Sequence, residues 1–297
     1  MTELIKDLLK NDKKLYYYNN NIYPFVIMQL VNDNIINYYF DNFSSYTNYL
    51  IEPFKKKNIK IYFLSYGNHK FKNSIQRIKI EAERMNIFDK IYCFTEKDLD
   101  KQFLKQHGDF INKNDRGGGY WIWKPYIIKK VLDEMNENDI LFYVDSGSQL
   151  NMEGLERLCE YFEIVTNSKY GSLAFELPYL EKNWTKGDLF VHFGVQSNKN
   201  ITHSWQLMAT SFVLRKCDHV MSMINEWNTV MSNYDLINDI PSKYSNYLGF
   251  TEHRHDQSVF SVIRKLRGSE IILDETCFPL LWDEFINYPI HAKRLRF

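Results

Sequence analysis

An acidic residue directly follows an uninterrupted apolar run near the middle of the chain. The run covers residues 140–144 and is followed by Asp145, Ser146 and Gly147. We expect a buried strand that ends in a sharp turn, which places the Asp145 carboxylate at the carboxyl edge of a sheet. Open α/β sheets bind their ligands at that edge, so the carboxylate would lie beside a ligand. The alternative is an aspartate that only caps the turn.

A second candidate segment combines glycines, tryptophans and cations upstream of this strand. Three glycines at 117–119 allow close approach of the backbone to a ligand. The neighbouring arginine and lysine can neutralise phosphates, and the indole rings offer stacking faces. If the segment is extended, Trp121 and Trp123 point to opposite sides and only one of them meets the ligand. A flexible loop followed by aromatic core anchors is the alternative. The residues expected to bind a ligand are Arg116, Gly118, Gly119, Trp123 and Lys124.

Polar and ionisable side chains crowd the start of a later predicted helix. Residues 253–257 are His, Arg, His, Asp and Gln, and Val259, Phe260 and Ile263 follow at helical spacing. The amino end of a helix carries free amide hydrogens and a positive dipole end, both of which favour an anion. Five polar side chains exceed what capping requires. The alternative is Asp256 as the helix cap with exposed histidines.

Alternating strands and helices must position these groups. We expect strands at 61–67, 90–95, 140–144, 172–177, 208–216 and 270–273, and helices at 71–85, 125–135, 152–166, 218–231 and 255–266, with an irregular stretch at 184–204. Residues 1–58 give a mixed pattern: a short amphipathic helix, a polar turn at 19–21, an apolar run at 24–31, and then an Asn- and Tyr-rich helix or loop. The alternation predicts a single α/β domain over residues 1–297, with a mixed, mostly parallel sheet flanked by helices. Residues 59–297 would form its core, and residues 1–58 an extension packed on it.

Three segments, in order, resemble those of GT-A-fold nucleotide-sugar glycosyltransferases. In chain order they are RGGGYWIWKP, FYVDSGSQL and HDQS. The resemblance extends from about residue 61 to the C-terminus and is greatest to small polysaccharide-pathway transferases of microbes and large DNA viruses. It implies a Rossmann-related GT-A domain with an Asp-x-Asp motif, whose acids bind ribose and a Mn²⁺ or Mg²⁺ ion that bridges the diphosphate. Gly147 replaces the second acid, so Asp145 would be the only metal ligand of the motif and metal dependence stays open.

The resemblance also implies roles for individual residues. Asp256 would be the general base that deprotonates the acceptor hydroxyl, with Asp188 as a rival. The donor would lie against Ser65, Tyr66, Gly67, Asp145, Ser146 and Gly147, and the acceptor against Trp184, Asp188, His255 and Gln257. The C-terminal residues His291, Lys293 and Arg294 would form a lid over the diphosphate, whereas a disordered basic end is the alternative.

Composition limits the partners. The 297 residues include 37 Lys+Arg and 37 Asp+Glu, so the net charge is +0. This balance argues against nucleic-acid binding, which depends on a surplus of cations. No segment approaches the roughly 20 apolar residues of a membrane span, and the N-terminus lacks a signal pattern. We therefore expect a cytoplasmic protein, in the host cytoplasm if the source is viral. The four cysteines lack metal-ligand spacing, and we expect them to be buried.

The preferred function is transfer of a hexose or deoxyhexose from a UDP-, GDP- or dTDP-sugar to a hydroxyl of a glycan or glycoconjugate, with inversion. A retaining GT-A transferase is the first alternative. A catalytically inactive nucleotide-sugar or glycan-binding module is the second, because the second acid of the motif is missing. A dinucleotide oxidoreductase is disfavoured, since no GxGxxG follows a strand.

Overall fold

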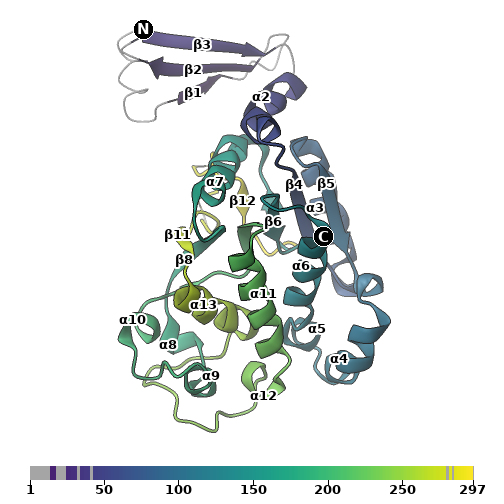
Figure 1. Ribbon diagram of the computed structural model, residues 1–297, viewed down its shortest axis with the longest axis vertical. Coiled ribbons are helices and arrows are strands. Elements are labelled where there is room, and N and C mark those ends of the chain that lie inside the picture. The colour runs from purple at the N-terminus through teal and green to yellow at the C-terminus, as the bar shows by residue number, and fades with distance from the viewer. Residues whose placement is uncertain are drawn as a thin grey trace. The chain divides into compact units, whose positions relative to one another are not determined.

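The computed structural model describes residues 14–17, 25–31, 34–40, 43–278, 281–282 and 284–296 (Figure 1). The chain divides into two compact units, residues 1–58 and 59–297. The helix expected near the N-terminus and the turn at 19–21 lie outside the described residues. That the first unit packs on the second stays a prediction.

The first unit is an antiparallel sheet followed by a helix. Strands β1 (Lys14–Tyr17), β2 (Phe25–Val31) and β3 (Asn34–Phe40) pair in that order, and helix α2 covers Phe43–Lys56. The Asn- and Tyr-rich segment expected as a helix or loop therefore begins with a strand. Its isoleucines and tyrosines favour strands, because branched and aromatic side chains fit a pleated surface.

The second unit contains a seven-stranded mixed sheet. Its strands are β4 (Ile61–Tyr66), β5 (Lys90–Phe94), β6 (Ile140–Val144), β8 (Ser172–Leu180), β9 (Trp205–Leu207), β10 (Ser211–Arg215) and β11 (Glu270–Leu273). The order is β11-β8-β10-β6-β4-β5, and β9 pairs with β8. Strands β5, β4, β6, β8 and β11 share one direction, while β10 and β9 run against it. The expected α/β class with a mixed, mostly parallel sheet is confirmed.

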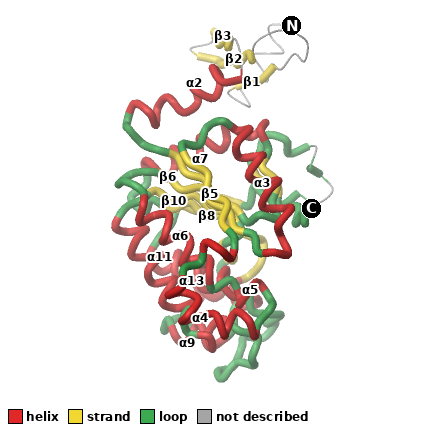
Figure 2. Tube along the Cα trace, turned by 90° about the vertical axis from the view of Figure 1, so that its right-hand side faces the viewer, coloured by secondary structure: helices red, strands yellow, loops and turns green. Residues whose placement is uncertain are grey.

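Helices cover both faces of this sheet. Helices α3 (Lys72–Met85) and α7 (Leu155–Asn167) pack on one face, and α6 (Trp123–Glu134), α11 (Asp218–Met231) and α13 (His255–Arg267) pack on the other. Figure 2 shows α3 on one side of the strands and α6 and α11 on the opposite side. Among the described helices, none has the length and apolar character needed to cross a bilayer.

Shorter elements complete the unit. They are α4 (Lys101–Lys113), α5 (Gly117–Tyr120), α8 (Glu181–Trp184), α9 (Gly187–His192), α10 (Lys199–Thr202), α12 (Tyr234–Ile237), the 3₁₀ turns η1 (His69–Phe71), η2 (Glu96–Asp98) and η3 (Met152–Gly154), and the paired strands β7 (Gln149–Leu150) and β12 (Ile290–His291). The stretch 184–204, expected to be irregular, thus contains two short helices.

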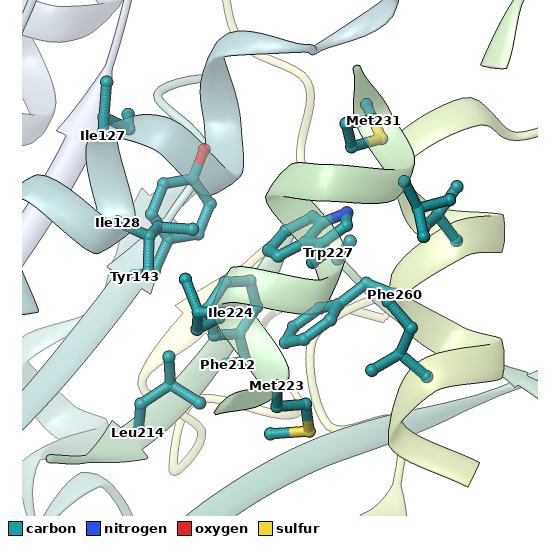
Figure 3. Packing of buried hydrophobic residues seen from close by; sticks show 14 of the residues in the cluster. Ile127, Ile128, Tyr143, Phe212, Leu214, Met223, Ile224, Trp227, Met231 and Phe260 are labelled. Carbon is teal, nitrogen blue, oxygen red and sulfur yellow. The ribbon is translucent and has the colours of Figure 1, made fainter. Parts of the chain in front are cut away.

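Strand β6 is fixed by apolar contacts on both faces. Tyr143 faces α6 and α11 in the cluster that also holds Trp227 and Phe260, whose rings stack with centroids 3.9 Å apart (Figure 3). Phe142, the neighbouring residue, points to the other face and contacts Phe162 of α7, with centroids 6.2 Å apart. Alternate residues of a strand face opposite sides of the sheet, so both faces of β6 are buried. This packing fixes the position of the residue that follows the strand.

Candidate functional site

A cavity of about 850 Å³ lies where the parallel strands end. Tyr66 ends β4, Asp145 follows β6, Tyr179 lies near the end of β8 and Asp274 follows β11. We call this cavity the strand-end pocket; its lining residues are 66–68, 70, 71, 115–118, 121, 123, 145–148, 177–179, 208, 210, 254, 257, 274, 277, 292, 294 and 296. It lies at the carboxyl edge of the sheet, where the sequence places the ligand site.

One wall is built on a left-handed turn. All residues from 117 to 121 have positive φ, between 53° and 83°. A left-handed conformation costs roughly 1–2 kcal/mol per residue that has a Cβ atom, so Tyr120 and Trp121 are strained. The glycines are required there for packing as well, because a Cβ at Gly117 would lie 2.3 Å from the Trp121 ring, and one at Gly119 would lie 2.8 Å from Ile111. Gly119 therefore contacts Ile111, and only the first two glycines line the pocket.

Both tryptophans of this segment line the pocket, contrary to the expectation for an extended chain. The left-handed turn and the start of α6 replace the extended conformation, so the two side chains do not alternate. Trp123 stacks on Tyr66 at a centroid distance of 3.9 Å, and its Nε1–H donates to Gly117 O at 2.9 Å. Trp121 lies against the ring of His255, with centroids 5.5 Å apart. The two indole rings are thus held in place by the rings of Tyr66 and His255.

Lys124 joins two carboxylates behind the pocket wall. Its Nζ lies 3.2 Å from Asp145 Oδ1 and 2.7 Å from Asp256 Oδ2, and it donates to Ala209 O at 3.1 Å. The side chains of Lys124 and Asp256 are only 2% and 7% exposed, whereas that of Asp145 is 28% exposed and lines the pocket. Asp145 Oδ1 also accepts from the Tyr143 hydroxyl at 2.6 Å. We call Lys124, Asp145 and Asp256 the charge triad.

The pKa values of two members of the triad, Asp256 and Lys124, are raised for different reasons. Burial raises the pKa of Asp256 to about 6, because Asp145 reinforces the effect and Lys124 only partly opposes it. Burial alone would lower the pKa of Lys124, yet the two nearby carboxylates outweigh it and raise this pKa. Lys124 therefore stays protonated at neutral pH, and Asp256 titrates within the range in which enzymes work.

Arg254 supplies a cation to the pocket in a different way. Its guanidinium carbon lies 3.8 Å from the centroid of the Trp184 ring and 4.6 Å from that of Tyr179. Its backbone N–H donates to the backbone oxygen of Trp184 at 3.0 Å, so Arg254 contacts both the main chain and the ring of Trp184. Trp184 itself, predicted to lie beside the acceptor, is not part of the pocket lining and lies under Arg254.

The C-terminal segment closes another side of the pocket. Leu295 donates its N–H to Gly147 O at 2.7 Å, and its carbonyl accepts from Ser74 Oγ at 3.0 Å. Arg294 and Arg296, on either side of it, line the cavity. His291, expected in the lid, is instead buried in the short β7–β12 pair.

The other predicted residues divide between the pocket and the interior. Tyr66, Gly67, Arg116, Ser146, Gly147 and Gln257 line the cavity, whereas Ser65, Asp188 and His255 are buried away from it. Both oxygens of Asp188 accept backbone N–H groups, from Lys243 at 3.2 Å and Tyr244 at 2.9 Å. Asp188 therefore anchors the loop after α12.

Two further side chains belong to this region. Arg77 of α3 donates to the carbonyl oxygens of Ser146 and Ser148 at 2.8 and 2.9 Å and so holds the loop after β6. Cys277 is exposed and lines the pocket, whereas Cys159 and Cys217 are buried as expected. The guanidinium of Arg77 thus supplies hydrogen-bond donors to two carbonyl groups of a loop, where no neighbouring strand provides them.

The residues of this site do not form a ligand set for a divalent cation. Among the described residues, no group of three or more His, Cys, Asp and Glu side chains converges. The carboxylate of Asp145, the predicted metal ligand, already contacts the Lys124 ammonium and the Tyr143 hydroxyl. Hard cations require several oxygen ligands, and here a cation of the protein stands next to the carboxylate instead.

Several pocket residues were not predicted from the sequence, above all Arg296, Lys70 and the guanidinium of Arg254. Arg254 belongs to the polar segment at the start of α13, but that segment does not by itself indicate a role for it. Its pairing with Trp184 spans 70 positions of the chain and leaves no local pattern. The basic C-terminal segment HAKRLRF was the available signal for Arg296.

The pocket and the strand order define an α/β protein with a cavity at the carboxyl edge of a mixed sheet. No protein-family model matches the sequence, and no curated protein sequence matches it either. Several solved structures are similar in fold, with identities of 10–12%.

Three of these structures are glycosyltransferases. A glycosyltransferase involved in the glycosylation of the major capsid of PBCV-1 is 12% identical, with a TM-score of 0.45, over 80% of this chain and 95% of that one. The galactosyltransferase LgtC, in complex with donor and acceptor sugar analogues, is 11% identical, with a TM-score of 0.40, over 78% and 86% of the two chains. Mouse xyloside xylosyltransferase 1, in its apo form, is 10% identical, with a TM-score of 0.41, over 79% and 97%.

Proposed function

We propose that the protein transfers a sugar from a nucleoside diphosphate donor to a hydroxyl group of a glycan or glycoconjugate. The observation that carries the proposal is the strand-end pocket, which joins indole faces, arginines and the pocket-facing carboxylate of a buried charge triad. Indole faces suit sugar rings and bases, and arginines suit phosphates. The resemblance of the three sequence segments to nucleotide-sugar glycosyltransferases points to the same reaction.

The reaction makes defined demands on the site. The bond between C1 of the sugar and the diphosphate oxygen breaks, and its electron pair leaves with the diphosphate. The acceptor oxygen forms the new bond to C1, and its proton passes to a base. The site must therefore stabilise negative charge on the diphosphate, accept a proton and exclude water.

Two carboxylates can serve this chemistry. Asp256 is the base predicted from the sequence, and a pKa of about 6 suits a proton acceptor near neutral pH. In the structure its carboxylate contacts Lys124, whereas the carboxylate of Asp145 lines the pocket. We therefore propose that Asp145 touches the substrate; that Asp256 is the base stays a prediction.

A donor screen with the whole chain tests this function. Purified protein is incubated with UDP-, GDP- and dTDP-sugars and a panel of oligosaccharide acceptors, and release of the nucleoside diphosphate is measured. We expect release from at least one donor that increases with an acceptor present. Binding of a donor without any release would support the inactive module instead.

Two variants then distinguish the roles of Asp145 and Asp256 in the reaction. Asp145→Asn should lower kcat/KM about 100-fold or more, because it removes the carboxylate that meets the substrate. If Asp256 is the base, Asp256→Asn lowers kcat by a similar factor at unchanged KM; if it only positions Lys124, KM rises as well. Analysis of the product anomer by NMR distinguishes inversion from retention, and a retained configuration would remove the base role altogether.

A further inference from the structure

The cations that line the strand-end pocket fall into two groups. Lys70 lies 2.5 Å from Asp115, and Arg116 lies within 3.1 Å of Asp239 and Glu252. Their charges are already neutralised by acids of the protein. In contrast, no salt bridge between described residues includes the arginine cluster, which we define as Arg254, Arg294 and Arg296.

Aromatic rings hold two members of the arginine cluster without neutralising them. Arg254 lies over the Trp184 and Tyr179 rings, at 3.8 and 4.6 Å, and the guanidinium carbon of Arg296 lies 5.8 Å from the Phe71 centroid. A ring face attracts a cation through its quadrupole but carries no net charge. The positive charge therefore stays available to a ligand while the side chain is held in place.

The cluster gathers like charges around one cavity. Burial lowers the pKa of Arg254; Tyr179 and Glu252 oppose this shift, and the positive charge of Arg294 adds to it. Two guanidinium groups that repel each other across a cavity are stabilised when an anion with several oxygens binds between them. Arginine presents its donors in a planar fork that matches phosphate oxygens.

The segment that carries Arg294 and Arg296 is fixed next to the turn that follows β6 and contains Gly147. Its anchor is the hydrogen bond from the Leu295 N–H to Gly147 O, at 2.7 Å. A Cβ at Gly147 would lie 3.6 Å from the Cα of Arg294, so the missing second acid of the Asp-x-Asp pattern would face this segment. An arginine-bearing segment thus lies where the resemblance implies a carboxylate and a metal ion.

From this geometry we infer that the arginine cluster binds the diphosphate of the donor directly and neutralises it without a divalent cation. The inference rests on the proposed function, since it assigns the donor's diphosphate to this cavity. The cluster neutralises the diphosphate in place of a divalent cation. Among the described residues, no group of side chains forms a ligand set for such a cation. Arg254 and Arg296, to which the sequence analysis gave no role, become binding residues for the donor.

Inorganic pyrophosphate and UDP in excess EDTA are the probes for this site. Their affinities for the whole chain are measured by isothermal titration calorimetry, with wild type and with Arg254→Gln, Arg294→Gln and Arg296→Gln. We expect binding in EDTA and a loss of about tenfold or more for each substitution, because each removes charge-assisted hydrogen bonds. Arg267→Gln is the matched control: it removes an arginine from α13 that pairs with Glu226 outside the pocket, and it should leave the affinity unchanged.

Several results would overturn the inference. Binding that appears only when Mn²⁺ or Mg²⁺ is added is one of them, and equal affinities for the cluster variants and the Arg267→Gln control are another. Thermal unfolding of each variant checks its folding; if Arg254→Gln does not fold, the exposed Arg294 and Arg296 still provide the test.

The inference and the proposed function can fail separately. If pyrophosphate binds through the cluster but no donor releases its nucleotide in the presence of any acceptor, the function fails and the anion site stands. If a donor is turned over in EDTA at the same rate and KM in the cluster variants, the function stands and the cluster assignment fails.

Discussion

Two cations beside the same pocket, Lys124 and Arg254, are stabilised in different ways. Lys124 is 2% exposed, and its ammonium group contacts two carboxylates and a carbonyl oxygen. Arg254 is half-buried and lies on two aromatic rings, with no salt bridge to a described residue. A buried ammonium needs counter-charges, because desolvation of an isolated ion is costly. A guanidinium tolerates partial burial on ring faces, since it is large and weakly hydrated.

The difference separates an internal structural charge from a charge offered to a ligand. The charge triad neutralises Lys124 and fixes the direction of Asp145. The rings beneath Arg254 fix its position, and no described acid forms a salt bridge with it. The same pocket wall thus contains one cation that organises the protein and one that suits an anion.

The largest expected effect is that of Lys124→Met on stability. The substitution leaves two carboxylates close together with no cation between them, and breaking a buried ion pair costs about 3–5 kcal/mol in the free energy of unfolding. Urea denaturation measures this loss. Arg254→Met should cost only about 1 kcal/mol, because it removes ring contacts alone. Equal losses for the two variants would erase the distinction between the cations.

A smaller effect is expected in the pH dependence of stability. The pKa of Asp256 in the folded protein is about 6, above its ordinary value of 3.8. A raised carboxyl pKa means that the folded state holds its proton more tightly than the unfolded state. The contribution of Asp256 to the free energy of unfolding should therefore fall as the pH rises from about 4 to about 6 and stay level above that.

Urea denaturation between pH 4 and pH 7 measures this contribution as the difference between wild type and Asp256→Asn. A difference that does not change with pH would show that the carboxyl group of Asp256 titrates at its ordinary value. In that case Lys124 fully compensates the burial of the Asp256 carboxylate.

The smallest effect is expected for Trp184→Leu. Loss of one ring frees the Arg254 side chain, and a cation–π contact of about 0.5–1 kcal/mol corresponds to a roughly two- to fivefold weaker affinity for pyrophosphate. Calorimetry in EDTA measures the change. Trp205→Leu, at an exposed position of β9 outside the pocket lining, is the matched control and should leave the affinity unchanged. An unchanged affinity in Trp184→Leu would mean that ring contacts do not hold Arg254 for its ligand.

Local patterns in the sequence predicted the central elements of the fold. The apolar run at 140–144 is strand β6, and the expected helix at 218–231 and strand at 270–273 appear with the same bounds. Such elements can be predicted from the spacing of apolar residues. Apolar residues three or four positions apart lie on one face of a helix, and a short continuous apolar run fits a strand that is buried on both faces. Asp145 lines the pocket for the same reason, because it directly follows a strand that is buried on both faces.

Side chains that come together from distant parts of the chain could not be predicted in this way. Nothing near Lys124 in the sequence shows that Asp145 and Asp256 will enclose it, and nothing near Arg254 identifies Tyr179 as its partner. The left-handed turn at 117–121 is a further case. Glycines permit positive φ, but Tyr120 and Trp121 adopt it as well, and the local sequence does not predict this.

The sequence by itself determined the α/β class, most strands and helices, and the carboxylate at the edge of the sheet. Periodicity and strand ends are local properties, so one chain segment is enough to show them. Only the tertiary structure decided which cations are neutralised and which remain available to a ligand. Charge compensation depends on distances of a few ångströms between residues far apart in the chain, and folding alone sets these distances.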